Sequence, residues 1–318
     1  MSNILILGGS GFVGRSVCEK LVERSGGAGD RLIVPSRRPQ RAQHIRTLPT
    51  IELVQSDVHD DVELMRLLVG CDVVISLIAI LQGSEADFQR VHVDLPRKLV
   101  AACQASGVKR VVHVSALGAA PDAPSKYLRS KAAGEAVLRA AGLDLTVLRP
   151  SVIFGEHDRF LNLFASLQAV VPVMPLAGAS ARFQPVWVED VAAAIGAAMD
   201  DRSSIGQTVD CGGPAVYTLE ALVRFAGRCA GHERPVIPLP ETLGRLQAMV
   251  MEWLPGEPLM SRDNIDSMRV PNVLTGDFPG LEALGIQPAS VESVMTPLLQ
   301  GRSGIARLDP LRASAHPG

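Results

Sequence analysis

The segment that most constrains this chain is its first fourteen residues, MSNILILGGSGFVG. Residues 4–7 form a short apolar run typical of a strand buried on both faces, and glycines follow at once. Gly8, Gly11 and Gly14 are spaced by three, and with Gly9 the segment also satisfies G-x-G-x-x-G. Glycine permits a tight turn, close approach of backbone to a pyrophosphate, and close packing of helix on strand. A glycine triplet between a first strand and a first helix therefore predicts a dinucleotide-binding turn rather than a merely structural one.

The helix expected to follow this turn strengthens that prediction. The free backbone N–H groups at its start, together with the positive end of its dipole, attract phosphate groups. The residues of the turn expected to contact the dinucleotide are Gly8, Gly9, Ser10, Gly11, Phe12, Val13, Gly14 and Arg15.

Strand-like and helix-like patterns alternate through the first half of the chain. Repeated units of this kind predict an α/β fold, with a parallel, doubly wound sheet of the Rossmann type. After residues 4–7 the expected strands are 31–35, 51–55, 73–78, 110–115 and 144–148. The expected helices are 12–24, 60–69, 94–105 and 126–141. Asp60 and Asp94 are expected to cap two of these helices.

Composition narrows the class of protein. The 318 residues carry a net charge of −2, which gives no case for nucleic acid as a partner. Residues of hydrophobic type make up 47% and aromatic ones only 4%, as suits a sheet covered by helices. No apolar run reaches the roughly 18 residues that span a bilayer, and no signal peptide is expected. The five cysteines are scattered and never spaced as C-x-x-C, which predicts reduced thiols and no metal site. A cytoplasmic protein is therefore expected, with contact to the inner face of a membrane as an open alternative.

The pattern changes after Arg149-Pro150, where prolines interrupt the periodicity. Helical patterns resume at 188–199, 219–230 and 241–253. We expect a nucleotide-binding domain over residues 1–150, whose sheet and helices continue to about 212. A smaller, mainly helical lobe over 213–302 is expected to close over the sheet's carboxyl edge, followed by a mobile tail over 303–318.

Residues 241–253 predict a helix with one apolar face. The residues that recur there at intervals of three and four are Leu243, Leu246, Met249, Val250 and Trp253. We interpret this face as packing against the core. The alternative is a lip for a long-chain lipid such as a quinone, or a docking face for a membrane partner.

Tyr127 and Lys131 are the clearest candidates for acid–base chemistry. A spacing of four places both side chains on one face of a helix. There the ammonium would favour the phenolate and lower the pKa of Tyr127 toward neutrality. Ser115 ends the preceding strand, where its hydroxyl can hydrogen-bond a carbonyl or alkoxide. The three together predict a catalytic site, with a structural surface pair as the alternative.

With these motifs the chain resembles the short-chain dehydrogenase/reductase superfamily, in its extended or atypical branch, over nearly its whole length. The segments that carry the resemblance are 8–14 (GGSGFVG), 56–58 (SDV), 113–115 (HVS), 127–131 (YLRSK), 149–155 (RPSVIFG) and 186–191 (VWVEDV). Within that branch the chain is most similar to bacterial relatives of the nucleotide-binding accessory subunit of respiratory complex I. The segments that carry this narrower resemblance are 115–119 (SALGA), 125–135 (SKYLRSKAAGE) and 259–264 (LMSRDN).

The resemblance implies a role for each matching position. Tyr127 would be the acid–base residue, Lys131 would lower its pKa while binding the nicotinamide ribose, and Ser115 would orient the substrate. Asp57 would contact the adenine amino group, and Pro150 would pack near the nicotinamide. Further cofactor contacts are expected at Val58, Leu77, Ile78, Ala79, Val152 and Ile153.

The chain departs from the family pattern near its third expected helix. His92-Val93 stands where extended members have Asn-Val, and the strand that carries Ser76 continues into Leu-Ile-Ala without an asparagine. A proton relay through such an asparagine is therefore in doubt. His92 is either a substitute relay or a hydrogen-bonded structural histidine.

The end of the second expected strand bears on the choice of nicotinamide cofactor. An Asp or Glu there would bind the unphosphorylated ribose, whereas residues 34–38 read VPSRR. Arg37, Arg38 and Arg15 are placed to bind a 2′-phosphate by charge-assisted hydrogen bonds. Solvation of a loop, together with Arg41, is the alternative. NADP(H) is therefore preferred, with NAD(H) as the alternative.

The sequence thus predicts an NADP(H)-dependent oxidoreductase in which Tyr127 moves the proton and a small-molecule or lipid-like compound is the substrate. One alternative is a nucleotide-bound structural or assembly factor associated with complex I or ubiquinone biosynthesis. Another is an NAD-dependent epimerase or dehydratase. Substrate identity and oligomeric state are not predicted.

Overall fold

The computed structural model describes residues 2–27, 29–253 and 258–300, so the tail expected over 303–318 lies outside the described residues. The chain divides into two compact units that are interleaved along the sequence. The first unit comprises Met1–Ser151, Val188–Gly212 and Leu274–Gln287. The second comprises Val152–Trp187, Gly213–Val273 and Pro288–Gly318. Each unit is thus built from segments far apart in the chain.

A seven-stranded sheet forms the centre of the first unit, in the order β11-β6-β5-β4-β1-β2-β3. Its strands are β1 (Asn3–Leu7), β2 (Arg31–Ser36), β3 (Ile51–Gln55), β4 (Val73–Ser76), β5 (Arg110–Val114), β6 (Asp144–Pro150) and β11 (Thr208–Cys211). Every neighbouring pair is parallel. All the strands therefore end at one edge, and the residues that follow them are brought together there.

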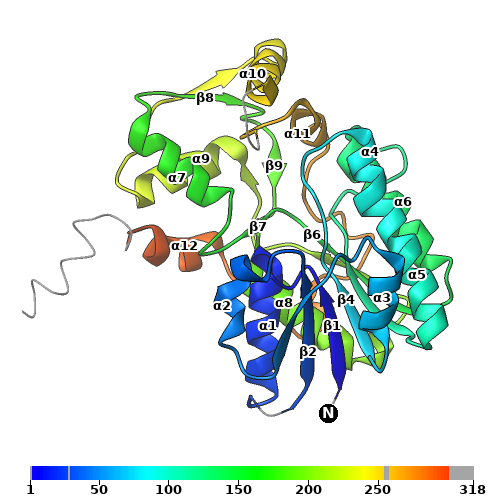
Figure 1. Ribbon diagram of the computed structural model, residues 1–318. Helices are drawn as coiled ribbons and strands as arrows, with labels where there is room; N and C mark the ends of the chain where they lie inside the picture. The colour runs from blue at the N-terminus through cyan, green and yellow to red at the C-terminus, as the bar shows by residue number, and fades with distance from the viewer. Residues whose placement is uncertain (1, 28, 254–257, 301–318) are drawn as a thin grey trace, which may run out of the picture. The chain divides into compact units, whose positions relative to one another are not determined.

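Helices cover both faces of this sheet (Figure 1). The helices on one face are α3 (Asp61–Leu68), α5 (Leu95–Ser106) and α6 (Lys126–Arg139), and those packed together on the other are α1 (Phe12–Arg24) and α8 (Val188–Asp200). The short elements of this unit are η1 (Pro39–Ala42), α2 (Gln43–Arg46), α4 (Glu85–Phe88), the π-helix η2 (Gln89–Asp94), η3 (Arg202–Ser204) and η4 (Leu281–Leu284). This is the Rossmann-type α/β fold expected from the sequence.

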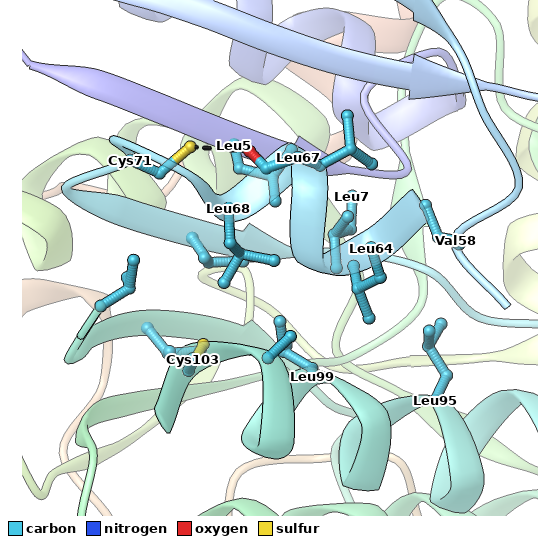
Figure 2. Packing of buried hydrophobic residues seen from close by; sticks show 14 of the residues in the cluster. Leu5, Leu7, Val58, Leu64, Leu67, Leu68, Cys71, Leu95, Leu99 and Cys103 are labelled. Carbon is cyan, nitrogen blue, oxygen red and sulfur yellow. Dashed lines mark hydrogen bonds between the residues drawn. The ribbon is translucent and has the colours of Figure 1, made fainter. Parts of the chain in front are cut away.

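Aliphatic packing between sheet and helices holds the first unit together. Figure 2 shows Leu5 and Leu7 of β1 against Leu64 and Leu68 of α3, with Leu99 of α5 completing the cluster. Each of these side chains is at most 1% exposed. Burying a leucine side chain stabilises the folded state by roughly 1.5–3 kcal/mol, so this aliphatic layer is a main source of stability for the sheet.

The expected elements agree with the observed ones to within two residues at either end. The expected cap at Asp60 is confirmed, since its carboxylate accepts from the N–H groups of Val62 and Glu63. The expected cap at Asp94 is wrong. The π-helix η2 runs directly into α5, so Asp94 meets no free helix start, and its carboxylate instead accepts from Gln89 and Arg97.

The second unit contains short strands and helices. These are β7 (Ile153–Phe154), α7 (Leu161–Val170), β8 (Met174–Ala177), β9 (Arg182–Phe183), β10 (Val186–Trp187), β12 (Tyr217–Thr218), α9 (Leu219–Cys229), β13 (Val236–Leu239), α10 (Glu241–Trp253), α11 (Arg262–Ser267) and α12 (Val291–Gln300). Its main apolar cluster joins α7, α9 and α12 through side chains such as Phe164, Leu222 and Met295.

The interpretation of the apolar face of α10 as core packing is wrong. Leu246 is 52% exposed and Trp253 is 80% exposed, whereas the small residues Gly244 and Ala248 are buried. A β-carbon at Gly244 would lie 2.6 Å from the β-carbon of Ala177. Because the helix approaches β8 this closely, its small side turns inward. The large apolar side chains that face outward are those of Leu243, Leu246, Val250 and Trp253.

Candidate active site

The glycine turn between β1 and α1 has the geometry that dinucleotide binding requires. Gly8 has φ of +88°, in the left-handed region that favours glycine. A β-carbon at Gly14 would lie 2.3 Å from the carbonyl oxygen of Gly8 and 2.5 Å from Cα of Gly9, so α1 packs on the turn only without a side chain there. Gly11 is exposed, and a β-carbon there would meet only Gly8, at 3.3 Å. The backbone of Gly11 is therefore open to close approach by a ligand.

The start of α1 is open to an anion. Its N-cap is Gly11, which has no side chain to cap the helix, and its first turn contains no acidic residue. The first N–H groups and the positive end of the dipole are thus available to phosphate. Ser10, Phe12 and Val13, also predicted as cofactor contacts, are each partly exposed in this segment.

Residues after β3 and β4 flank the glycine turn along the same edge. Asp57 is exposed, and its carboxylate accepts from the N–H of His59, which holds the loop in a turn. Val58 instead packs into the aliphatic cluster (Figure 2), so only its backbone is left to face a ligand. Ile78 contacts the turn, because a β-carbon at Gly8 would lie 3.2 Å from its N and Cγ1 atoms. Leu77 and Ala79, at least partly exposed, lie on either side of Ile78.

The three arginines predicted near a 2′-phosphate differ in their surroundings. Arg37 and Arg38 are exposed beyond the end of β2, and the backbone N–H of Arg38 donates to Ser36 Oγ at 3.3 Å. Arg15 instead pairs with Glu19 one turn along its own helix, Nε to Oε1 at 2.8 Å. The strand end thus presents two guanidinium groups and no carboxylate.

Ser115, Tyr127 and Lys131 lie where β5 meets α6. Lys131 is 2% exposed, and its Nζ donates to the carbonyl oxygen of Val114 at 2.8 Å. The backbone N–H of Ser115 donates to the carbonyl oxygen of Leu148. The Ser115 hydroxyl is buried and has no hydrogen-bond partner within the described residues. A buried hydroxyl left in this state is costly, and a polar ligand atom would satisfy it.

The prediction that Lys131 lowers the pKa of Tyr127 is wrong for this arrangement. Burial raises the pKa of Tyr127 to about 12. Burial also lowers the pKa of Lys131 to about 8, opposed by the charge of Glu135. The ammonium is hydrogen-bonded to backbone, and desolvation dominates at the phenol. Tyr127 is therefore a neutral phenol at physiological pH, able to donate a proton.

His92 is buried and hydrogen-bonded at both ring nitrogens. Its Nε2 accepts from the N–H of Ile80 at 3.1 Å, and its Nδ1 lies 2.7 Å from Ser130 Oγ. Burial and the charge of Lys131 lower the pKa of His92 to about 3, so the ring is neutral. Both ring nitrogens are thus engaged in hydrogen bonds, one with the backbone and one with a side chain of α6.

An ion-pair network lies behind Lys131 that the sequence analysis did not identify. Glu135 follows Lys131 by four residues on the same face of α6, and that spacing was the available signal. The neighbouring strand residue Arg149 donates to both carboxylate oxygens of Glu135. Asp210 of β11 lies opposite Arg149 in the strand register, and burial raises the pKa of Asp210 to about 6.

The residues of the first unit fit a nicotinamide dinucleotide. The glycine turn, the uncapped start of α1 and the exposed Asp57 suit its pyrophosphate and adenosine half. Pro150 is buried at the end of β6, and its carbonyl oxygen accepts from the N–H of Leu117, two residues after Ser115. Val152 and Ile153, also predicted as contacts, belong to the second unit.

Comparisons with known proteins identify an NAD(P)H-binding family. The model of a family described as NAD(P)H-binding matches residues 8–162. The chain is 34% identical over 301 residues to the mitochondrial NADH dehydrogenase (ubiquinone) 1 alpha subcomplex subunit 9 of Mus musculus, covering 90% of this chain and 77% of that protein. It is also 34% identical over 192 residues to the ceramide reductase of Caulobacter vibrioides, covering 60% of this chain and 58% of that protein.

A solved structure shares the fold. The dTDP-glucose 4,6-dehydratase of Streptomyces venezuelae, a double mutant with NAD bound, has a TM-score of 0.73 and 20% identity. The match covers 97% of this chain and 99% of the dehydratase, and at this identity it shows the fold alone. Among the described residues, no helix is long and apolar enough to cross a membrane.

Proposed function

This chain belongs to the family of the alpha subcomplex subunit 9 of NADH dehydrogenase (ubiquinone), within the extended or atypical short-chain dehydrogenases/reductases, and from that premise we propose that it is an NADPH-dependent reductase of a carbonyl or quinone-like group. The observation that carries the proposal is the buried, unsatisfied hydroxyl of Ser115, which follows the residue whose carbonyl Lys131 binds. Tyr127 lies one turn before Lys131 on α6. The polar oxygen of a bound carbonyl substrate would satisfy this hydroxyl.

The proposed reaction divides between cofactor and protein. When bound, the nicotinamide supplies the hydride that adds to the substrate carbon, and NADPH becomes NADP⁺. Ser115 donates a hydrogen bond to the carbonyl oxygen and orients it. Tyr127 donates its phenolic proton to that oxygen, which yields the alcohol, and the phenolate regains a proton from solvent. Burial raises the pKa of Tyr127 to about 12, so the phenol is protonated before each turnover.

The preference for NADPH rests on the end of β2. Arg37 and Arg38 are exposed there, and a guanidinium binds a phosphate by paired, charge-assisted hydrogen bonds. An acidic residue that would repel the 2′-phosphate is absent from residues 34–38.

The substrate is proposed to be lipid-like. One relative is named for ubiquinone and another for ceramide, and both compounds are long-chain lipids with a polar head. The outward apolar face of α10, with Leu246 and Trp253, supports contact with a lipid surface. We therefore place the protein at the cytoplasmic face of a membrane, held there peripherally, and sedimentation with lipid vesicles tests this placement.

The experiment is NADPH oxidation on addition of a lipid and metabolite extract from the host. Wild type is compared with Tyr127→Phe and Tyr217→Phe, the two tyrosines of the chain. The Tyr217 hydroxyl hydrogen-bonds Glu292 in the second unit, so its variant is the matched control. The proposal expects oxidation that depends on the extract, is lost in Tyr127→Phe and persists in Tyr217→Phe. NADPH that binds equally to all three and is never oxidised would reject it.

The second candidate is a nucleotide-bound structural or assembly factor of a respiratory complex. The 34% identity to a complex I subunit favours it. On this alternative NADPH stabilises the fold by mass action and is not consumed. Co-purification with the complex, lost at high salt or in detergent, together with inert NADPH, would support it. An NAD-dependent epimerase or dehydratase rests on fold likeness alone, and sugar-nucleotide turnover with bound NAD tests it.

A further inference from the structure

His92 occupies an unusual piece of backbone. It lies in the π-helix η2, between α4 and α5, and is 3% exposed. π-Helical turns are rare and occur frequently at functional sites. Helix α6 approaches this turn closely, since a β-carbon at Gly134 would lie 2.0 Å from the carbonyl oxygen of His92. The imidazole is therefore held firmly between the π-turn and the helix that carries Tyr127.

The hydrogen bonds of His92 define one tautomer. Ser130 Oγ donates its only proton to the carbonyl oxygen of Tyr127 at 2.7 Å. Ser130 Oγ must then accept from His92 Nδ1, which carries the ring proton. Nε2 is left as an acceptor, and the N–H of Ile80 donates to it. The ring thus needs to be neutral, with one nitrogen as donor and the other as acceptor.

These two bonds join the cofactor side of the site to the helix that carries the catalytic residues. Ile80 lies two residues after Ile78, which packs against Gly8 in the glycine turn. Ser130 lies on α6 between Tyr127 and Lys131. The connection therefore runs from the glycine turn through the loop after β4 to the proton donor, and every part of it is in the first unit.

The ring itself also packs against the proton donor. The ring centroids of His92 and Tyr127 are 5.7 Å apart at an interplanar angle of 76°. Phe88 lies 5.6 Å from His92 and 6.3 Å from Tyr127, which completes a group of three aromatic rings. The two contacts that Tyr127 makes with these rings are edge-to-face, and such contacts favour one orientation of the phenol.

We propose that His92 is a positioning residue, which fixes the loop of residues 77–80 at a set distance from Tyr127 by bridging the Ile80 N–H and the Ser130 hydroxyl. It neither touches the reacting atoms nor carries the transferred proton. Its role is to hold the cofactor-contacting loop and the phenol of Tyr127 in fixed positions relative to each other. The effect on turnover rests on the proposed function, whereas the bridge and its effect on NADPH binding do not.

Hydrogen exchange in the protein without cofactor tests the bridge. His92→Asn keeps an amide donor near the position of Nδ1 but loses the acceptor for the Ile80 N–H. His92→Gln keeps an acceptor near the position of Nε2 but loses the donor to Ser130. We expect the Ile80 amide to exchange on the order of tenfold faster in His92→Asn, as loss of one hydrogen bond implies. The exchange of β1 and β5 amides should change far less. Leu99→Ala, a cavity in the aliphatic cluster, is the control for general loss of stability.

NADPH binding and turnover test the consequence. We expect both His92 variants and Ser130→Ala to raise the Kd of NADPH on the order of tenfold, because each breaks one end of the same bridge. The double variant His92→Asn/Ser130→Ala should be little worse than the poorer single one. If turnover is found, kcat should also fall in these variants.

Three results would overturn the inference. One is unchanged exchange at Ile80 in His92→Asn. Another is equally fast exchange in Leu99→Ala, which would make His92 merely part of the core. The third is a Kd for NADPH that none of the variants changes. NADPH that binds normally in wild type without turnover would reject the proposed function and leave these readouts of the bridge intact.

Discussion

Arg149 holds the carboxylate of Glu135 through two hydrogen bonds, Nε to Oε1 at 2.9 Å and Nη2 to Oε2 at 2.7 Å. The Glu135 side chain is 3% exposed and that of Arg149 is 16% exposed, so the pair is largely desolvated. Phe278 lies under the guanidinium, 5.0 Å from its Cζ atom to the ring centroid. The same carboxylate stabilises the charge of Lys131, which lies one turn earlier on α6. The pair therefore links the integrity of the sheet edge to the charge state of the site.

Glu135→Gln should destabilise the first unit by about 3 kcal/mol, because it leaves Arg149 buried without its counter-charge. Urea unfolding at neutral pH measures this change. Glu52→Gln is the control, since Glu52 pairs with Arg31 at the exposed start of β2 and should lose no more than about 0.5 kcal/mol. If both variants lose the same small amount of unfolding free energy, the buried pair stabilises the fold no more than an exposed pair does.

Lys131 should make the protein more stable as the pH rises from 8 to 10. Its pKa is about 8 in the fold against 10.5 unfolded, so over this range the unfolded chain binds a proton that the folded chain does not. The unfolding free energy of wild type should rise relative to Lys131→Met by roughly 2 kcal/mol. Tyr127, whose pKa is raised to about 12, acts in the opposite direction only above pH 10. If the difference in unfolding free energy between the two proteins does not change with pH, the pKa of Lys131 is near its ordinary value.

The fold was predictable because its signals are local. Apolar runs of strand length, glycines after them and helical periodicity each depend on a few neighbouring residues, and they located the strands and helices of the sheet. The spacing of Tyr127 and Lys131 likewise indicated that they share a face. The direction of the Tyr127 pKa shift was not predictable, since burial competes with the nearby charge and only the tertiary structure sets the balance.

Two other features depended on distant contacts. Periodicity showed which side chains of α10 share a face, but the close contact of Gly244 with Ala177 turns that face outward. The role of His92 was left open because its partners, Ile80 and Ser130, lie 12 and 38 residues away in the chain. A local sequence pattern does not reveal contacts between residues this far apart in the chain.

Gly14→Ala should abolish NADPH binding and destabilise the first unit by more than 1 kcal/mol. Its β-carbon would lie 2.3 Å from the Gly8 carbonyl, so the turn or α1 must move. Gly196→Ala is the matched control within α8, where a β-carbon meets nothing within 4 Å. This control should gain roughly 0.5–1 kcal/mol from reduced backbone entropy of the unfolded chain. Fluorescence titration of NADPH and urea unfolding check both variants, and a Gly14→Ala protein that binds NADPH normally would contradict the assigned turn.

Arg37→Ser/Arg38→Ser should weaken NADPH binding by about tenfold or more and leave NADH binding nearly unchanged. The reason is loss of the charge-assisted contacts to the 2′-phosphate, the only group that distinguishes the two cofactors. Arg41→Ser is the control, an exposed arginine in the following η1 segment. Titrations at two salt concentrations measure the effect. Equal losses for NADPH and NADH, or an equal loss in Arg41→Ser, would remove the basis for the NADPH preference.

Leu246→Ser should leave stability within about 0.5 kcal/mol of wild type, because that side chain is 52% exposed on the outer face of α10. Ala248→Leu should destabilise the fold by roughly 1–3 kcal/mol, since Ala248 is fully buried in a cluster with Ala177 and Ile265 and a larger side chain overpacks it. Urea unfolding of the second unit, followed by the fluorescence of Trp187 and Trp253, compares the two variants. If Leu246→Ser were the more damaging, the apolar face would be packed rather than exposed, and the proposed contact with lipid would lose its surface.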